Sequence, residues 1–137
     1  MDSLLDTNVI SQRTKKEPDA RVVSWLKQVE SSELYLSAIS LAEIAFGIEE
    51  MPAGRKRENF ELWLGHDLRQ GFAGRILGID ERIAEAAGRL ASKAKKAGAK
   101  PEFADALIAA TAKMHGLRLA TLNWKHFEGL GVELVKF

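Results

Sequence analysis

Three acidic residues stand in segments whose other residues are typical of a protein interior. Asp6 ends a short apolar run, Glu43 lies within residues 39–46, and Asp105 lies within residues 103–110. An ionised carboxylate in apolar surroundings is unfavourable unless it is paired or binds a metal. A divalent cation bound by all three acids would explain why each carboxylate stands in an apolar segment. The sequence therefore predicts a metal-dependent hydrolase.

The expected ligands favour Mg²⁺ or Mn²⁺ over Zn²⁺. All three acids offer hard oxygen atoms, the chain has no cysteine, and its three histidines do not have zinc-ligand spacing. Each acid taken alone also has a simpler interpretation. Asp6 could cap a helix, Glu43 could be a buried partner of a structural Arg or Lys, and Asp105 could complement the dipole of its helix.

Short apolar runs alternate with helical patterns along the chain. Strands are expected at residues 3–6, 34–37, 75–79, 117–121 and 132–136. Helices are expected at residues 20–29, 40–51 (with Ser37 or Ser40 as its cap), 55–70, 80–98 and 101–116. This alternation predicts an α/β fold, as one domain over residues 1–137 around a mainly parallel sheet of about five strands. Sites in such sheets form beyond the carboxyl ends of the strands, where Asp6 and residues 121–123 would lie.

Composition narrows the class of protein only modestly. The formal net charge is +1, so the total charge does not by itself indicate a nucleic-acid-binding protein. Lysine and arginine cluster at residues 13–16, 55–57 and 93–100, and such clusters can contact phosphates or be solvated surface. No apolar run approaches the roughly 20 residues that span a bilayer, and the N-terminus lacks a signal-peptide pattern. We therefore expect a cytoplasmic protein without a membrane segment.

Four segments in order carry a family resemblance. Residues 4–8 (Leu-Leu-Asp-Thr-Asn), 42–44 (Ala-Glu-Ile), 105–112 and 120–127 together resemble the PIN domain, in particular the VapC/FitB-type toxins of bacterial type II toxin–antitoxin pairs. The similarity extends over essentially the whole chain. It implies a three-layer α/β/α sandwich and a Mg²⁺- or Mn²⁺-dependent endoribonuclease that cuts RNA. It also implies inhibition by a cognate antitoxin, and a homodimer or a toxin–antitoxin hetero-oligomer.

The resemblance also implies roles for individual residues. The metal-binding acids of the family correspond to Asp6, Glu43 and Asp105, and two further site residues correspond to Thr7 and Asn123. Many PIN domains have a fourth aspartate in the last segment, but here residues 121–127 contain no acid. Asn123 could ligate through its carbonyl without adding charge, so three carboxylates should hold one metal better than two. In the same segment His126 could assist with a proton or be structural, and Asn8 would support Asp6.

Basic residues and aromatic residues give two further expectations. Arg13, Lys15, Lys16 and residues 55–57 are expected to contact the RNA backbone. An antitoxin seat is expected between the helices at 20–29 and 40–51, with Trp25 in contact with the partner.

Two alternatives remain open from the sequence. The missing fourth acid favours a PIN-fold binding module without activity. A phosphatase-like or receiver-like phosphoryl-transfer domain is also compatible with an aspartate after the first strand. Against the phosphatase, Asp6 is not followed by a second aspartate two positions on.

Overall fold

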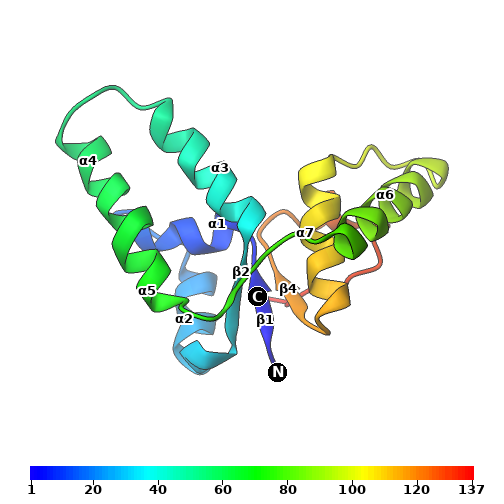
Figure 1. Ribbon diagram of the computed structural model, residues 1–137. Coiled ribbons are helices and arrows are strands. Elements are labelled where there is room, and N and C mark those ends of the chain that lie inside the picture. The colour runs from blue at the N-terminus through cyan, green and yellow to red at the C-terminus, as the bar shows by residue number, and fades with distance from the viewer.

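The computed structural model describes residues 1–137, and a four-stranded parallel sheet lies at its centre (Figure 1). The strand order is β3-β2-β1-β4. The strands are β1 (Ser3–Leu5), β2 (Leu34–Ser37), β3 (Ile76–Leu77) and β4 (Arg118–Ala120). They are four of the five expected apolar runs, which is the pattern of a parallel sheet buried on both faces.

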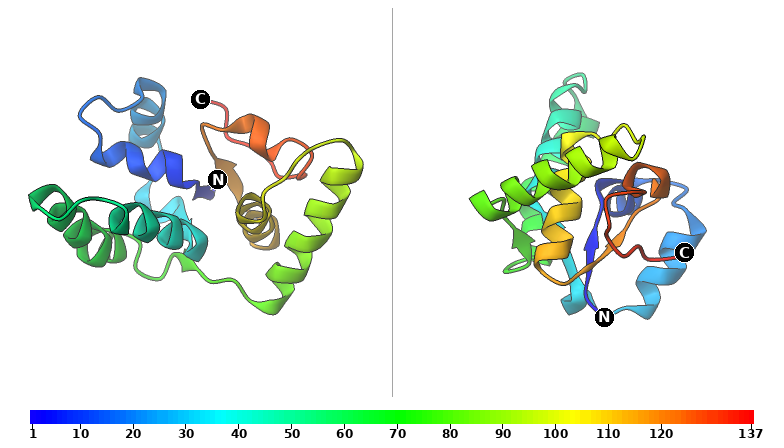
Figure 2. Two further views of the ribbon diagram at one scale, coloured as in Figure 1. Left: turned by 90° about the horizontal axis from the view of Figure 1, so that it is seen from above. Right: turned by 90° about the vertical axis from the view of Figure 1, so that its right-hand side faces the viewer.

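Helices cover both faces of the sheet, which confirms the expected three-layer α/β/α architecture. The helices are α1 (Thr7–Ile10), α2 (Ala20–Gln28), α3 (Ala38–Glu49), α4 (Arg55–Leu62), α5 (Arg69–Gly71), α6 (Glu81–Lys96), α7 (Phe103–Met114) and α8 (Trp124–Phe127). In Figure 1, α6 and α7 lie on one side of the sheet, and α2, α3, α4 and α5 lie on the other. Figure 2 shows the same separation from above.

The alternation of side chains along β1 divides the core in two. Leu4 is fully buried in a cluster with residues of α6 and α7, such as Ala87 and Ile108. Its neighbour Leu5 is fully buried in the other cluster, which includes Val9 of α1 and Ile44 of α3. Successive side chains of a strand point to opposite faces, so three residues of β1 anchor both halves of the molecule.

The helix boundaries follow the expected capping signals. The Ser37 hydroxyl accepts a hydrogen bond from the Ile39 N–H (3.1 Å), and the Asp80 carboxylate accepts one from the Ile83 N–H (2.9 Å). Gly116 follows the end of α7 with φ of 67°, a conformation that favours glycine. Ser37 rather than Ser40 is therefore the cap of α3, and both the 80–98 and the 101–116 predictions are confirmed.

The expected fifth strand is reduced to a single bridge. Leu119 of β4 pairs in parallel with Leu134, donating to the Glu133 carbonyl and accepting from the Val135 N–H, both at 2.8 Å. Because both bonds go to Leu119 alone, the segment touches the sheet at one residue pair and forms no strand.

The helix expected at residues 55–70 contains a wider turn. It runs as α4, then a π-helical segment at Trp63–Leu68, then α5. Such turns interrupt α-helices most often near functional sites. No helix of the structure is long and apolar enough to span a lipid bilayer.

We expect Leu5→Ala to lower the free energy of unfolding by about 2–5 kcal/mol, because it opens a cavity beneath the central strand. Leu62→Ala is the control, since the Leu62 side chain is 67% exposed and its loss should change stability by less than about 0.5 kcal/mol. Urea denaturation of both variants measures the difference. Equal stabilities would contradict the central role of β1.

Candidate active site

Asp6 stands at the carboxyl end of β1, where it caps α1. Its side chain is only 5% exposed, and its Oδ1 accepts a hydrogen bond from the Thr7 N–H (2.8 Å). Burial raises the pKa of the Asp6 carboxyl, while hydrogen bonds from Thr121 and Thr7 act in the opposite direction. The cap explains the location of Asp6, but it does not account for such a deeply buried charge.

A hydrogen-bond network joins Asp6 to the end of β4. The Thr121 hydroxyl donates to Asp6 Oδ2 (2.8 Å), and the Asn8 amide donates to the same oxygen (3.3 Å). Asn8 Oδ1 in turn accepts from the Leu122 N–H (3.0 Å). Because β1 and β4 are adjacent, these residues over a hundred positions apart fix the orientation of one carboxylate.

Glu43 reaches the same edge of the sheet from α3. The Thr7 hydroxyl donates to Glu43 Oε1 (2.8 Å) and lies 3.0 Å from the Ser40 hydroxyl. Thr7 therefore lies between Asp6, whose carboxylate its N–H contacts, and Glu43. The expected role of Thr7 as a site residue agrees with this position.

The expectation that the segment around Glu43 belongs to the protein interior is wrong for one face of α3. Ile44 and Ile48 are buried, but Phe46 is 68% exposed and Glu43 is also exposed. α3 packs one stripe of side chains against the core, and nothing in the chain covers its other face. Glu43 consequently stands at an open edge of the site, where its side chain has room to rotate.

Asp105 lies in the first turn of α7, on the other side of the sheet end. Its side chain is 15% exposed, and Ile108 and Ala109 on the same helix are buried, as the apolar spacing predicts. Burial and the nearby Asp6 carboxylate raise the pKa of Asp105 to about 6, against a smaller opposing effect of His126. Glu43 makes a smaller contribution to the same rise in the pKa of Asp105.

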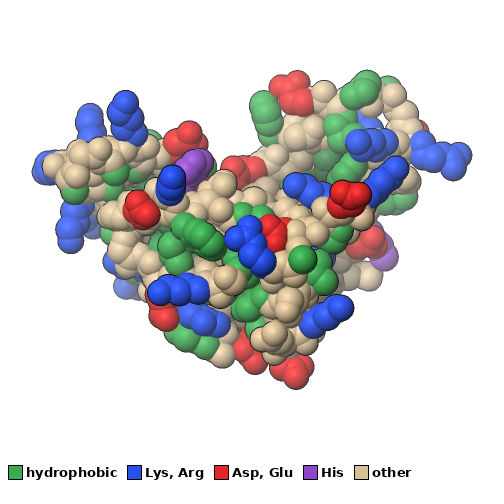
Figure 3. Space-filling model, turned by 180° about the vertical axis from the view of Figure 1, so that it is seen from behind, with side chains coloured by type: hydrophobic (Ala, Val, Ile, Leu, Met, Phe, Trp, Pro, Cys, Tyr) green, Lys and Arg blue, Asp and Glu red, His purple; other side chains and the backbone are tan.

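A small hollow lies beside Asp105. Its volume is about 130 Å³. It is lined by Ala99, Lys100, Pro101, Glu102, Asp105, Lys125, His126 and Glu128. His126 Nδ1 lies 3.5 Å from Asp105 Oδ2, which is ion-pair distance when the imidazole is protonated. Figure 3 shows the surface notched between two raised parts, with acidic side chains near the bottom of the notch and lysine or arginine on both parts.

Asn123 is held at the site through its backbone. Its N–H donates to the Thr121 hydroxyl (3.0 Å), while its exposed side chain makes no hydrogen bond. Of the expected site residues, Thr7 contacts both Asp6 and Glu43, Asp105 affects the site only through its charge, and Asn123 lies at the margin with a free amide. The sequence places residues 121–123 at the strand end where the site forms but assigns no role to Thr121, because its bond to Asp6 depends on the pairing of β1 with β4.

The donor groups suit a hard divalent cation, although the side chains do not yet converge. No three Asp, Glu or His side chains lie close enough together to hold a metal ion in this arrangement. Burial and then repulsion from Asp6 raise the pKa of Asp105, and a bound cation would offset both effects. Since Glu43 is exposed, its rotation could bring a third carboxylate toward Asp6 and Asp105.

Comparison with known proteins identifies the family. The family model described as the PIN domain matches residues 3–131. The chain belongs to the PIN-domain family. The match agrees with the parallel sheet, and nothing in it supports the phosphatase-like or receiver-like alternative.

Two similar proteins and one solved structure extend nearly over the whole chain. VapC ribonuclease Y4jK of Sinorhizobium fredii is 40% identical over 132 residues, covering 96% of this chain and 94% of its own length. Toxin FitB of Neisseria gonorrhoeae is 42% identical over 124 residues, covering 90% and 89%. The crystal structure of FitAcB from Neisseria gonorrhoeae superimposes with a TM-score of 0.91 at 39% identity, covering 98% of this chain and 96% of the other.

Two of the basic residues expected to contact RNA are engaged within the protein. The Arg57 guanidinium pairs with Glu49 (2.9 Å) and Glu61 (3.0 Å). The Arg13 guanidinium lies over the Phe72 ring, 5.6 Å from its centroid. Lys15 and Lys16 make no ion pair, and for them contact with RNA stays a prediction.

Trp25 also lies in a different setting from the one expected. Its ring meets Phe137 edge-on, with the ring centroids 5.5 Å apart. The hollow that Trp25 lines, of about 430 Å³, is bounded by α2 and the C-terminal residues, and no residue of α3 lines it. The expected groove between α2 and α3 is therefore not where Trp25 points.

We expect Asp6→Asn to lower the pKa of Asp105 from about 6 toward its ordinary value, because the substitution removes the nearest repelling charge. Asparagine also caps helices well, so the fold should be kept. NMR titration of the aspartate carboxyl carbons measures the change. Asp67→Asn, at an exposed position outside the site, is the control; an unchanged pKa of Asp105 in Asp6→Asn would show that the two acids are not coupled.

Proposed function

We propose that this chain is a metal-dependent endoribonuclease that acts as the toxin of a toxin–antitoxin pair. The observation that supports it best is the position of Asp6, Glu43 and Asp105 at the carboxyl end of the sheet, where Thr7 contacts both Asp6 and Glu43 and where Asp6 helps to raise the pKa of Asp105. The similarity to proteins named VapC ribonuclease and toxin FitB supports the same activity.

Asp6, Glu43 and Asp105 would hold the metal, which we propose to be Mg²⁺ or Mn²⁺ because all the donors are carboxylate oxygens. When bound, such a cation would neutralise phosphate charge and lower the pKa of a water, so that the water loses a proton and becomes a better nucleophile. Three carboxylates with the neutral Asn123 as the only further donor favour one metal over two.

The remaining residues of the site position these acids and the substrate. Thr121 and Asn8 fix the Asp6 carboxylate, and the Thr7 hydroxyl orients Glu43. Lys100 and Lys125 line the hollow beside Asp105 and would attract a phosphate of the RNA backbone. Preorganised groups of this kind spare the reorganisation that free carboxylates would need in water.

A PIN-fold binding module without activity is the second candidate. It is favoured by the missing fourth acid and by the open position of Glu43. Metal binding separates the two functions, because a module that only binds a partner has no use for a cation at these acids.

The purified chain should cut single-stranded RNA with Mg²⁺ or Mn²⁺, and EDTA should abolish the cutting. Asp6→Asn should lose activity by more than about 100-fold, and Thr121→Val by about 10–100-fold, because the first removes a ligand and the second only its support. Initial rates on a labelled RNA measure both. Glu58→Gln, on α4 away from the acids, is the control. Cutting that survives in Asp6→Asn would contradict the proposed site.

We further propose a protein antitoxin as partner and a homodimer as the state of the free chain. The matched solved structures are described as toxin–antitoxin complexes, and the exposed Phe46 beside Glu43 offers apolar surface to a partner. An equimolar amount of the cognate antitoxin should stop RNA cleavage, and Phe46→Ala should weaken that inhibition. Inhibition assays and sedimentation of the free chain check both; an antitoxin without effect on the rate, or a monomer, would contradict them.

A further inference from the structure

An open groove lies on the flank of the molecule, away from the hollow beside Asp105. Its volume is about 690 Å³. Two elements line this groove: the turn after α1 and one face of α4. Its residues, which we call the lysine groove, are Thr14, Lys15, Lys16, Lys56, Asn59, Phe60 and Trp63.

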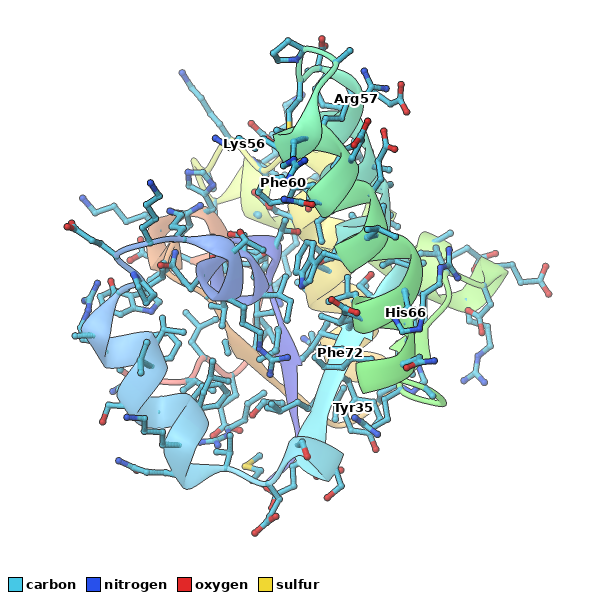
Figure 4. All side chains as sticks on the ribbon, turned by 90° about the vertical axis from the view of Figure 1, so that its left-hand side faces the viewer. Tyr35, Lys56, Arg57, Phe60, His66 and Phe72 are labelled. Atoms are coloured by element: carbon cyan, nitrogen blue, oxygen red, sulfur yellow. The ribbon has the colours of Figure 1, made fainter.

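The residues from α4, with Trp63 directly after it, form a single stripe. Asn59, Phe60 and Trp63 lie three, four and seven residues after Lys56, which places all four on one face of the helix. Figure 4 shows Lys56 and Phe60 on the side of α4 that carries this stripe, and Arg57 on the opposite side. The rings of Phe60 and Trp63 meet edge-on, with their centroids 6.3 Å apart and their planes at 86°, so the two ring faces point in different directions.

The groove is positively charged without compensation. No Asp or Glu lines it, and Lys15, Lys16 and Lys56 form no ion pair within the chain. The neighbouring Arg57 shows the contrast, because its charge is matched by two glutamates. Three unpaired ammonium groups around one hollow favour a polyanion.

The chain of α1 connects the site of the carboxylates to the groove. Thr7 begins α1 at the site, and the chain then passes through Ser11–Thr14 to reach the groove. With helical rises of 1.5–2.0 Å per residue, the distance along this path is about 12 Å. At 3.4 Å per stacked nucleotide, a strand leaving the carboxylates would reach the groove after roughly three or four nucleotides. Seen from above, α1 runs beside α3 and α4 (Figure 2).

We infer that the lysine groove binds a single-stranded stretch of the RNA substrate, a few nucleotides away from the bond that is cut. The three lysines contact backbone phosphates, and Phe60 and Trp63 stack on bases. Cations with aromatic rings between them are the usual composition of sites for single-stranded nucleic acid. A peptide segment made of acidic residues alone would use the lysines but not the rings. The inference rests on the proposed ribonuclease function and adds a second contact region to it.

Binding can be measured without cleavage. In an Asp6→Asn background with EDTA, fluorescence anisotropy of a 5′-labelled, unstructured RNA of about twelve nucleotides gives the affinity over a series of salt concentrations. Adding Lys15→Ala, Lys16→Ala and Lys56→Ala should make the slope of log affinity against log salt shallower by about two, since each phosphate contact to a single strand contributes about 0.7.

The matched control replaces three exposed cations of α6, Arg82, Arg89 and Lys93, by alanine. This removes the same charge from the opposite side of the sheet (Figure 1) and should leave the slope as in the parent. Thermal melting of both triple variants verifies that they are folded.

A second variant tests the rings. Phe60→Leu keeps an apolar side chain against the core but removes the stacking surface, so it should weaken binding about tenfold with an unchanged salt slope. In the wild-type background, the groove variants should raise KM for the long RNA and leave cleavage of an RNA of about four nucleotides unaffected.

The outcomes separate the inference from the proposed function. If the wild-type chain cuts RNA while the groove variants bind as tightly as the parent, the lysine groove is not part of the substrate site and the nuclease stands. If the triple variant keeps its RNA affinity but escapes an acidic antitoxin, the groove belongs to that partner and the inference is wrong. If the parent binds no RNA and the wild type cuts none, both fail.

Discussion

The burial of one negative charge at the end of the central strand is the constraint around which the molecule is arranged. Asp6 is almost completely buried, and burial alone would favour its neutral form. The Thr7 N–H, the Thr121 hydroxyl and the Asn8 amide offset part of that penalty. These donors come from α1 and from the end of β4, so α1 and the pairing of β1 with β4 must both be in place to supply them.

The repulsion that remains gives the site its character. Burial, and then repulsion from the same Asp6 that the network stabilises, raise the pKa of Asp105 to about 6. Strong coupling between carboxylates is common where a protein prepares a position for a cation or a proton. The open position of Glu43 complements this arrangement, because its exposed side chain can rotate toward a cation bound by the two more buried acids.

Local features of the fold could be predicted from the sequence, but features that depend on which other element packs against a helix could not. Asp80 and Gly116 mark helix ends through their own side chain or backbone, so a few neighbouring residues are enough to predict these ends. The exposure of Glu43 and Phe46 depends on whether another element covers α3, which its apolar pattern does not reveal. The role of Thr121 needed the adjacency of β1 and β4, and the pairing of Arg57 needed the turn between α3 and α4.

The long separation between Asp6 and Thr121 along the chain also determines when the site can form during translation. The hydrogen bond between them spans 115 positions of the chain. At translation rates of about 5–20 residues per second, a growing polypeptide holds Asp6 for roughly 6–23 s before Thr121 is added. Until then β4 is not in place, and the carboxylate lacks one of the three donors that orient it. The complete site can therefore form only when synthesis of the chain is nearly finished.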